Sequence, residues 1–214
     1  MSNVDIRGRQ AYTGGGDAMV NINADANKGL QVYQGLPPFA ETQRRGDGWT
    51  VGTATLFAPL VAYPTTTAAL EVYNNGERTM VISSLYASQI LATAVVQTFA
   101  IYAMISTAKV VPTLTALNVY SLSGKAIVVP TAAGEIVTGV GTTVIANGWR
   151  PWGSVQAWAL AAATPGNSWS AEIDGRLIVP PGCSICLHVV GALATASSFQ
   201  AGLSFDWDSM TVEA

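Results

Sequence analysis

Two cysteines and one histidine, close together near the C-terminal end, are the residues with the most obvious chemical potential. Cys183 and Cys186 form a Cys-x-x-Cys pair, and His188 follows two residues later. A structural zinc site takes four ligands, and the sequence holds no further cysteine or histidine. Residues three apart in a strand point to opposite faces, so we expect a buried Cys183, Cys186 on the other face and no disulfide. The pattern predicts neither a metal site nor a cofactor.

His188 is also the sole histidine available as a base for a serine or cysteine nucleophile. A nucleophile elbow has the pattern Gly-x-Ser-x-Gly, and residues 166–170 approach this pattern but lack the final glycine. The sequence contains no other arrangement that suggests covalent catalysis. We therefore expect that the protein is not an enzyme.

Four tryptophans are the remaining candidates for a binding site or an interface: Trp149, Trp152, Trp158 and Trp169. We expect the first two in a loop and the other two on either side of a turn at residues 164–167. Aromatic side chains exposed on loops stack on sugars or anchor protein interfaces, whereas buried ones would close the ends of a sandwich. The sequence leaves both alternatives open.

The chain is poor in charge. Only 11% of its 214 residues are Asp, Glu, Lys or Arg, whereas a soluble domain has about 25%. A monomer with so little charge would expose large apolar areas, and such areas are usually covered by other protein. We therefore expect a homo-oligomer, with a trimer as the favoured state.

The composition argues against nucleic-acid and membrane partners. The formal net charge is −3, and the basic residues of the N-terminal segment, Arg7, Arg9, Arg44 and Arg45, are balanced by neighbouring acidic ones. Residues 90–108 are apolar enough to consider a membrane helix, but they include several Thr, Ser and Gln residues and no flanking Lys/Arg cluster. We expect the four arginines to contact other protein subunits, and neither nucleic acid nor membrane.

Two regions differ in composition. Residues 1–47 are rich in Gly, Asn, Asp and Gln, which cannot bury much apolar surface, so we expect an extended N-terminal arm. Residues 48–214 alternate apolar and polar residues in short runs, which predicts an all-β, antiparallel, jelly-roll-like sandwich of about ten short strands. Asn74-Asn75-Gly76 predicts a tight hairpin turn between strands at 68–73 and 78–85. The clearest strands are expected at 170–179, 183–190 and 197–208.

Three sequence segments support a resemblance to a known class of proteins. They are Leu-x-Val-Tyr-Asn-Asn-Gly-x-x-x-Met-Val-Ile at Leu70–Ile82, Leu-Ile-Val-Pro-Pro-Gly-Cys-Ser-Ile-Cys-Leu at Leu177–Leu187, and a closing strand that ends in Asp206-Trp207-Asp208. This layout resembles the jelly-roll domains of bacteriophage virion proteins, which include capsid decoration or cement proteins, head fibres and tail-associated modules. The resemblance covers about residues 50–208 and lies in the order of the segments and the residue pattern of the strands.

The resemblance implies a structural role in a virion. It implies a decoration or cement subunit, synthesised in the host cytoplasm, whose partners are further copies of the chain and the major capsid protein or other virion subunits. The alternative from a different class is a carbohydrate- or receptor-binding tail or fibre domain. In that case Trp149, Trp152 and acidic loop residues would form a platform for a glycan.

Overall fold

The computed structural model describes residues 7–9, 19–21, 43, 45–91, 97–144, 148–158, 168–191 and 197–208. The chain divides into two compact units, Met1–Leu36 and Pro37–Ala214. In the first unit, β1 (Arg7–Arg9) pairs antiparallel with β2 (Met19–Asn21). The boundary expected after residue 47 falls inside the second unit, where the Asp47 carbonyl accepts a hydrogen bond from the Trp207 amide at 3.0 Å.

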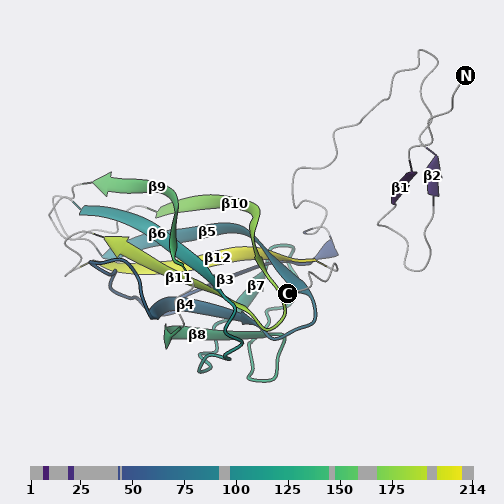
Figure 1. The fold of residues 1–214 in the computed structure, drawn as a ribbon, viewed down its shortest axis with the longest axis horizontal. Coiled ribbons are helices and arrows are strands. Elements are labelled where there is room, and N and C mark those ends of the chain that lie inside the picture. The colour runs from purple at the N-terminus through teal and green to yellow at the C-terminus, as the bar shows by residue number, and fades with distance from the viewer. Residues whose placement is uncertain are drawn as a thin grey trace, which may run out of the picture. The chain divides into compact units, whose positions relative to one another are not determined.

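The second unit is a β-sandwich of two five-stranded antiparallel sheets (Figure 1), which confirms the predicted fold class. No helix among the described residues is long and apolar enough to span a membrane. In order across the first sheet, the strands are β10 (Ser168–Val179), β5 (Thr79–Leu91), β12 (Ser198–Asp208), β3 (Gly48–Gly52) and β7 (Val119–Ser121). Across the second sheet they are β8 (Ile136–Thr143), β4 (Thr67–Asn74), β11 (Ser184–Gly191), β6 (Gln97–Ser106) and β9 (Arg150–Trp158).

The strand pairing gives the sandwich a jelly-roll topology. The two halves of the chain pair strand by strand: β3 with β12, β4 with β11, β5 with β10, and β6 with β9. This is a long antiparallel hairpin rolled across two sheets, as in double-sheet jelly rolls. The segment between β6 and β9 adds β7 beside β3 and β8 beside β4. One inserted segment therefore widens both sheets at the same side.

The turn expected at Asn74-Asn75-Gly76 is present, but the predicted hairpin is wrong. Strands β4 and β5 belong to different sheets, so the turn carries the chain from one layer to the other. The buried Asn74 side chain donates from Nδ2 to the carbonyls of Arg78 at 2.8 Å and Val179 at 2.9 Å. Its Oδ1 accepts from the Gly76 amide at 3.1 Å. The asparagine thus provides partners for backbone groups of the turn and for the carbonyl at the end of β10.

Strand β10 alternates buried and exposed side chains as predicted, but its pairing with β5 is interrupted by a bulge. Ala171, Ile173 and Val179 are buried, whereas Glu172, Asp174 and Arg176 are exposed. Between Glu172 and Leu177 the register against β5 shifts, and Asp174 and Gly175 adopt φ values of +50° and +76°. A bulge of this kind twists an edge strand away from further pairing.

Between the sheets lies an aromatic core. Phe99 and Phe199 meet edge to face with ring centroids 4.6 Å apart, and Trp169 packs against both. Cys183 belongs to this core, whereas Cys186 faces the opposite side of β11. Both cysteines are free and buried, so the two-sided placement is as predicted, but Cys186 is also covered by protein.

Replacing Asn74 by Ala should lower the free energy of unfolding by about 2–4 kcal/mol, because two backbone carbonyls lose their buried donor. Asn75→Ala is the matched control, since its Nδ2 bonds the Gly134 carbonyl in an exposed position and its loss should cost about 1 kcal/mol or less. Urea denaturation of both variants measures the difference. Equal costs would contradict the role assigned to Asn74.

Candidate functional site

Two of the four candidate tryptophans are packed inside the protein. Trp149 is 2% exposed, and its Nε1 donates to the Thr65 carbonyl at 3.0 Å. The Tyr63 hydroxyl donates to the Trp149 carbonyl, which ties the loop between β3 and β4 to the start of β9. Trp169 is 8% exposed and lies in the aromatic core. For these two residues the packing alternative is the one observed.

Trp152 lies on β9 and not in the expected loop, and Trp158 is the last residue of the same strand. Trp152 is half-buried against the core, and the Arg176 guanidinium lies 5.6 Å from its ring centroid. Its indole nitrogen is buried without a hydrogen-bond partner among the described residues. Trp158 pairs with Gln97 at the end of the strand, and its side chain lies outside the described part of the chain.

The candidate arginines of the N-terminal region are only partly described. Arg7 and Arg9 lie on β1, opposite Asn21 and Met19, but their side chains and all of Arg44 lie outside the described residues. Arg45 is exposed. Their expected contacts with other subunits stay a prediction.

Most of the exposed large apolar side chains of the described residues belong to the segment inserted between β6 and β9. Lys125 is the only charged residue of this segment between Lys109 and Glu135. Exposed apolar side chains concentrated in one segment of the chain are candidates for contact with other proteins. We call these side chains the insertion surface: Val110, Val111, Leu114, Tyr120, Leu122, Ile127, Val128 and Val129.

Within the inserted segment, the residues before β7 are fixed to β8 through Thr138. The Thr138 carbonyl accepts from the Thr115 amide at 2.7 Å, and its hydroxyl donates to the Thr115 carbonyl. The Leu117 amide donates to the same hydroxyl at 3.3 Å. At Gly139 an added Cβ would lie 3.0 Å from Pro112 Cβ and 2.4 Å from Thr142 Cγ2, so glycine allows the segment to approach the strand.

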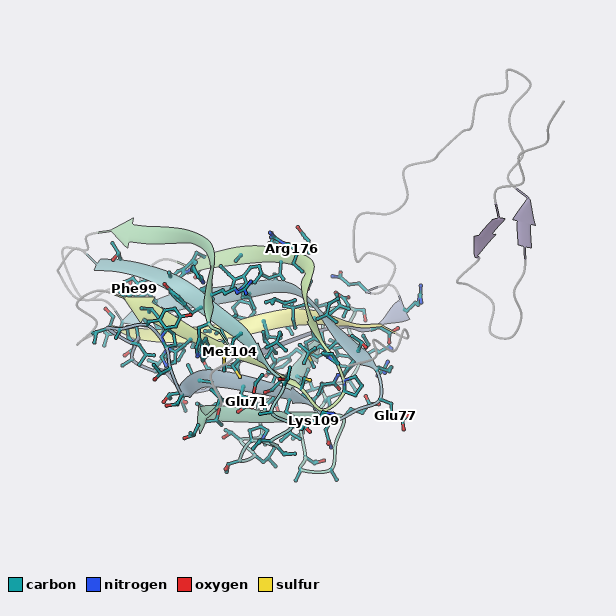
Figure 2. The ribbon with its side chains drawn as sticks, viewed as in Figure 1. Glu71, Glu77, Phe99, Met104, Lys109 and Arg176 are labelled. Carbon is teal, nitrogen blue, oxygen red and sulfur yellow. The ribbon has the colours of Figure 1, made fainter. Side chains whose placement is uncertain are left out.

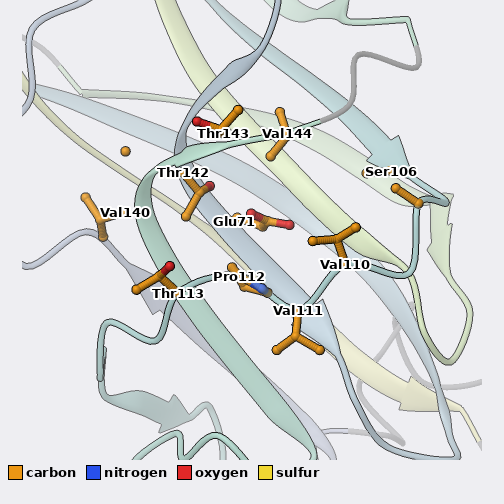
Figure 3. A pocket seen from close by; sticks show the side chains of 12 residues that line it. Glu71, Ser106, Val110, Val111, Pro112, Thr113, Val140, Thr142, Thr143 and Val144 are labelled. Carbon is orange, nitrogen blue, oxygen red and sulfur yellow. The ribbon is translucent and has the colours of Figure 1, made fainter.

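A cavity of about 360 Å³ lies between this segment and the outer face of the second sheet (Figure 3). Its walls come from residues 106–113 and 140–144, and Glu71 of β4 projects into it. Glu71 is 4% exposed, and the Ser184 hydroxyl donates to its Oε1 at 2.8 Å. The Thr142 hydroxyl also faces the carboxyl group, outside good hydrogen-bond geometry.

Burial determines the ionisation of the titratable groups around the cavity. It raises the pKa of Glu71, and the hydroxyls of Thr142 and Ser184 only partly oppose that rise. Cys186 lies directly across the ladder from Glu71. Burial raises the pKa of its thiol, and the negative charge of Glu71 raises it further. A protonated thiol is a weak nucleophile.

His188 lies on the same face of β11 as Cys186, but it forms no hydrogen bond or ion pair with Glu71. Its Nδ1 donates to the Val189 carbonyl at 2.9 Å, and its ring meets Phe57 edge to face at 5.4 Å. Burial lowers the pKa of His188, so the neutral imidazole is favoured. Among the described residues, no three His, Cys, Asp or Glu side chains come together in a way that would hold a metal ion.

Comparisons with known proteins identify no relative. No family model, no curated protein and no solved structure matches the chain.

Sequence reasoning did not select Glu71 or the insertion surface. The signal for Glu71 was a single carboxylate inside an otherwise apolar strand, Leu70-Glu71-Val72-Tyr73. The signal for the insertion surface was a long run with only one charge that is also interrupted by prolines. Such a run does not form one continuous strand, and its apolar side chains need not all face the core.

The pKa shift of Glu71 predicts a falling stability with rising pH. The folded protein holds the Glu71 proton more tightly than the unfolded chain, so stability is greatest below the ordinary pKa of a glutamate and is lost as pH rises through the raised value. Glu71→Gln should remove this loss. The measurement is the free energy of unfolding in urea between about pH 4 and 8.

The lowered pKa of His188 acts in the opposite sense, because stability is gained as pH rises towards the ordinary pKa of histidine. Both wild type and Glu71→Gln contain His188, so its contribution drops out when their free energies of unfolding are subtracted at each pH. Glu77→Gln, at an exposed turn position, is the matched control and should follow the wild-type profile. An identical pH profile for wild type and Glu71→Gln would contradict the assignment.

Proposed function

We propose that the protein is a virion structural protein, a capsid decoration or cement subunit that assembles as a trimer and binds the major capsid protein. The observation that carries this proposal is the insertion surface, an apolar and nearly uncharged segment on a jelly-roll sandwich. The jelly roll is an architecture of viral capsid and lectin domains. Because one fold hosts many functions, the argument depends on the surface more than on the topology.

The insertion surface suits contact with further copies of the same chain. The segment that carries it has only Lys125 as a charge between Lys109 and Glu135, so two copies approach without strong like-charge repulsion. Covering Tyr120, Leu122 and Val129 would remove exposed apolar area from water, which is the main driving force of association. A low overall charge is consistent with a chain that buries part of its surface in an assembly.

Attachment to the capsid is assigned to the N-terminal region, residues 1–47, with Arg7, Arg9, Arg44 and Arg45 as its basic contacts. A subunit that binds only the assembled shell stabilises that shell by mass action. The arrangement divides the two tasks, because the sandwich would hold the copies together while the N-terminal region binds the capsid protein.

A second candidate function is a carbohydrate-binding tail or fibre domain. A hollow of about 380 Å³ lies between β3, β5, β12 and the start of β7, and no charged side chain lines it. Tyr86, Tyr120, Asn118 and Gln200 contribute rings and carboxamides, which suit the apolar faces and hydroxyls of a neutral sugar. Copy number in purified particles distinguishes the two functions, because a decoration protein is present in hundreds of copies per virion.

The proposal predicts that the recombinant protein sediments as a trimer at micromolar concentration. A double variant, Leu122→Asp with Val129→Asp, should weaken association by about 100-fold or more, because each interface would gain like charges. Both positions are exposed in the single chain, so the fold should be retained. Sedimentation velocity measures the change.

Ile178→Asp is the matched control. Ile178 is an exposed apolar residue on β10, outside the insertion surface, and its replacement should leave the trimer intact. A wild-type protein that stays monomeric at micromolar concentration would overturn the proposal. A trimer that the double variant leaves unchanged would show that the subunits meet elsewhere.

A further inference from the structure

Glu71 is a buried acid that has no basic partner among the described residues. In the part of the chain that the structure describes, no Lys, Arg or His forms an ion pair with it. Lys109 is the basic residue of the segment over the cavity, but its side chain packs over Gly182, where an added Cβ would lie 3.6 Å from its Cγ. Burial raises the pKa of the Cys183 thiol, and the charge of Lys109 opposes that rise. Figure 2 labels Glu71 and Lys109.

The cavity around Glu71 has walls of two kinds. Apolar surface comes from Val110, Val111, Pro112, Val140 and Val144, while the serine and the threonines of the lining contribute hydroxyl groups. Figure 3 shows the Glu71 carboxyl group between the Val110–Pro112 side and Thr142. The volume of about 360 Å³ lies in the range of small-ligand sites. A ligand that fits must combine one polar group for Glu71 with an aliphatic part.

We propose that this cavity binds a primary ammonium group carried on a short aliphatic chain. The ammonium would donate to the Glu71 carboxylate, and the aliphatic part would lie against the valines and Pro112. An ammonium supplies the opposite charge that the buried carboxylate lacks, and charge-assisted hydrogen bonds are stronger than neutral ones. The same chemistry is offered by a free alkylamine and by a lysine side chain of another protein. The inference does not depend on the proposed virion function.

Binding at this site is coupled to release of a proton. Burial raises the pKa of Glu71 in the absence of a ligand, so below that raised pKa the group is mainly a neutral carboxylic acid. The ligand keeps its positive charge and the acid gives up its proton to solvent as the ion pair forms. Cys186 faces Glu71 from β11 but stays protonated, and the β8 wall, residues 140–143, contributes no titratable group. Affinity should therefore rise with pH until Glu71 is fully ionised.

The experiment is a calorimetric titration of the full-length protein with n-butylammonium, and with n-butanol as its neutral counterpart. Measurements in two buffers of different ionisation enthalpy count the protons released. We expect butylammonium to bind with proton release at a pH below the raised pKa, and butanol to bind about tenfold more weakly or not at all. No binding of butylammonium, or equal binding of butanol, would overturn the proposal.

Two variants separate the carboxylate from the rest of the protein. Glu71→Gln should lose butylammonium affinity by about tenfold or more and should release no proton. Glu77→Gln, which removes a carboxylate at the turn after β4 (Figure 2), should bind as wild type does. Nα-acetyl-lysine-N-methylamide tests the lysine source: its binding supports a protein ligand, and its exclusion while butylammonium binds supports a free amine.

A second measurement needs no variant. The carboxyl carbon of Glu71, followed by nuclear magnetic resonance in labelled wild-type protein, should titrate at lower pH when butylammonium is saturating. An unchanged titration midpoint, or a Glu71→Gln protein that binds butylammonium as tightly as wild type, would overturn the proposal. Trimer formation is a separate observable, so failure here leaves the virion hypothesis intact.

Discussion

Burial of β11 on both faces is the constraint on which the rest of this structure depends. One face supplies Ile185, Leu187 and Val189 to the core, while Ser184, Cys186 and His188 point the other way and are equally buried. A sheet with one face towards water needs no such cover. Here the loop after β3 and the segment between β6 and β9 must lie over the outer face, and each polar group there must find a partner inside the protein.

The segment that covers the outer face of the second sheet also carries most of the exposed large apolar side chains of the described residues. The part of the inserted segment before β8 bonds to Thr138, fits against Gly139 and adds β7 to the opposite sheet, so its backbone is held at several points. Lys125 is its only charge between Lys109 and Glu135, and most of the valines and leucines in that stretch remain exposed together with Tyr120. A segment that covers one sheet therefore presents new apolar area to its surroundings, which is why we place the subunit contacts on it.

The sequence predicted what depends on local alternation and missed what depends on the tertiary partner. Period-2 patterns located β10, β11 and β12, because each strand has at least one face committed to the core. The Asn74 turn was found, but its side chain bonds the distant Val179 carbonyl, and no local pattern shows that the flanking strands belong to different sheets. Burial of Glu71 and Cys186 likewise depends on the inserted segment folding back over them.

The cavity around Glu71 and the insertion surface have two residues in common, so a ligand in the cavity and a subunit on the surface would contact the same side chains. Val110 and Val111 line the cavity and are also exposed on the insertion surface. A side chain or ligand in the cavity would contact their inner sides, while a neighbouring subunit on the surface would contact their outer sides. Binding of a ligand and binding of a subunit would each reduce the conformational entropy of the same segment. Whichever binds first would lower the entropy loss of the second, which is the condition for positive coupling between two sites.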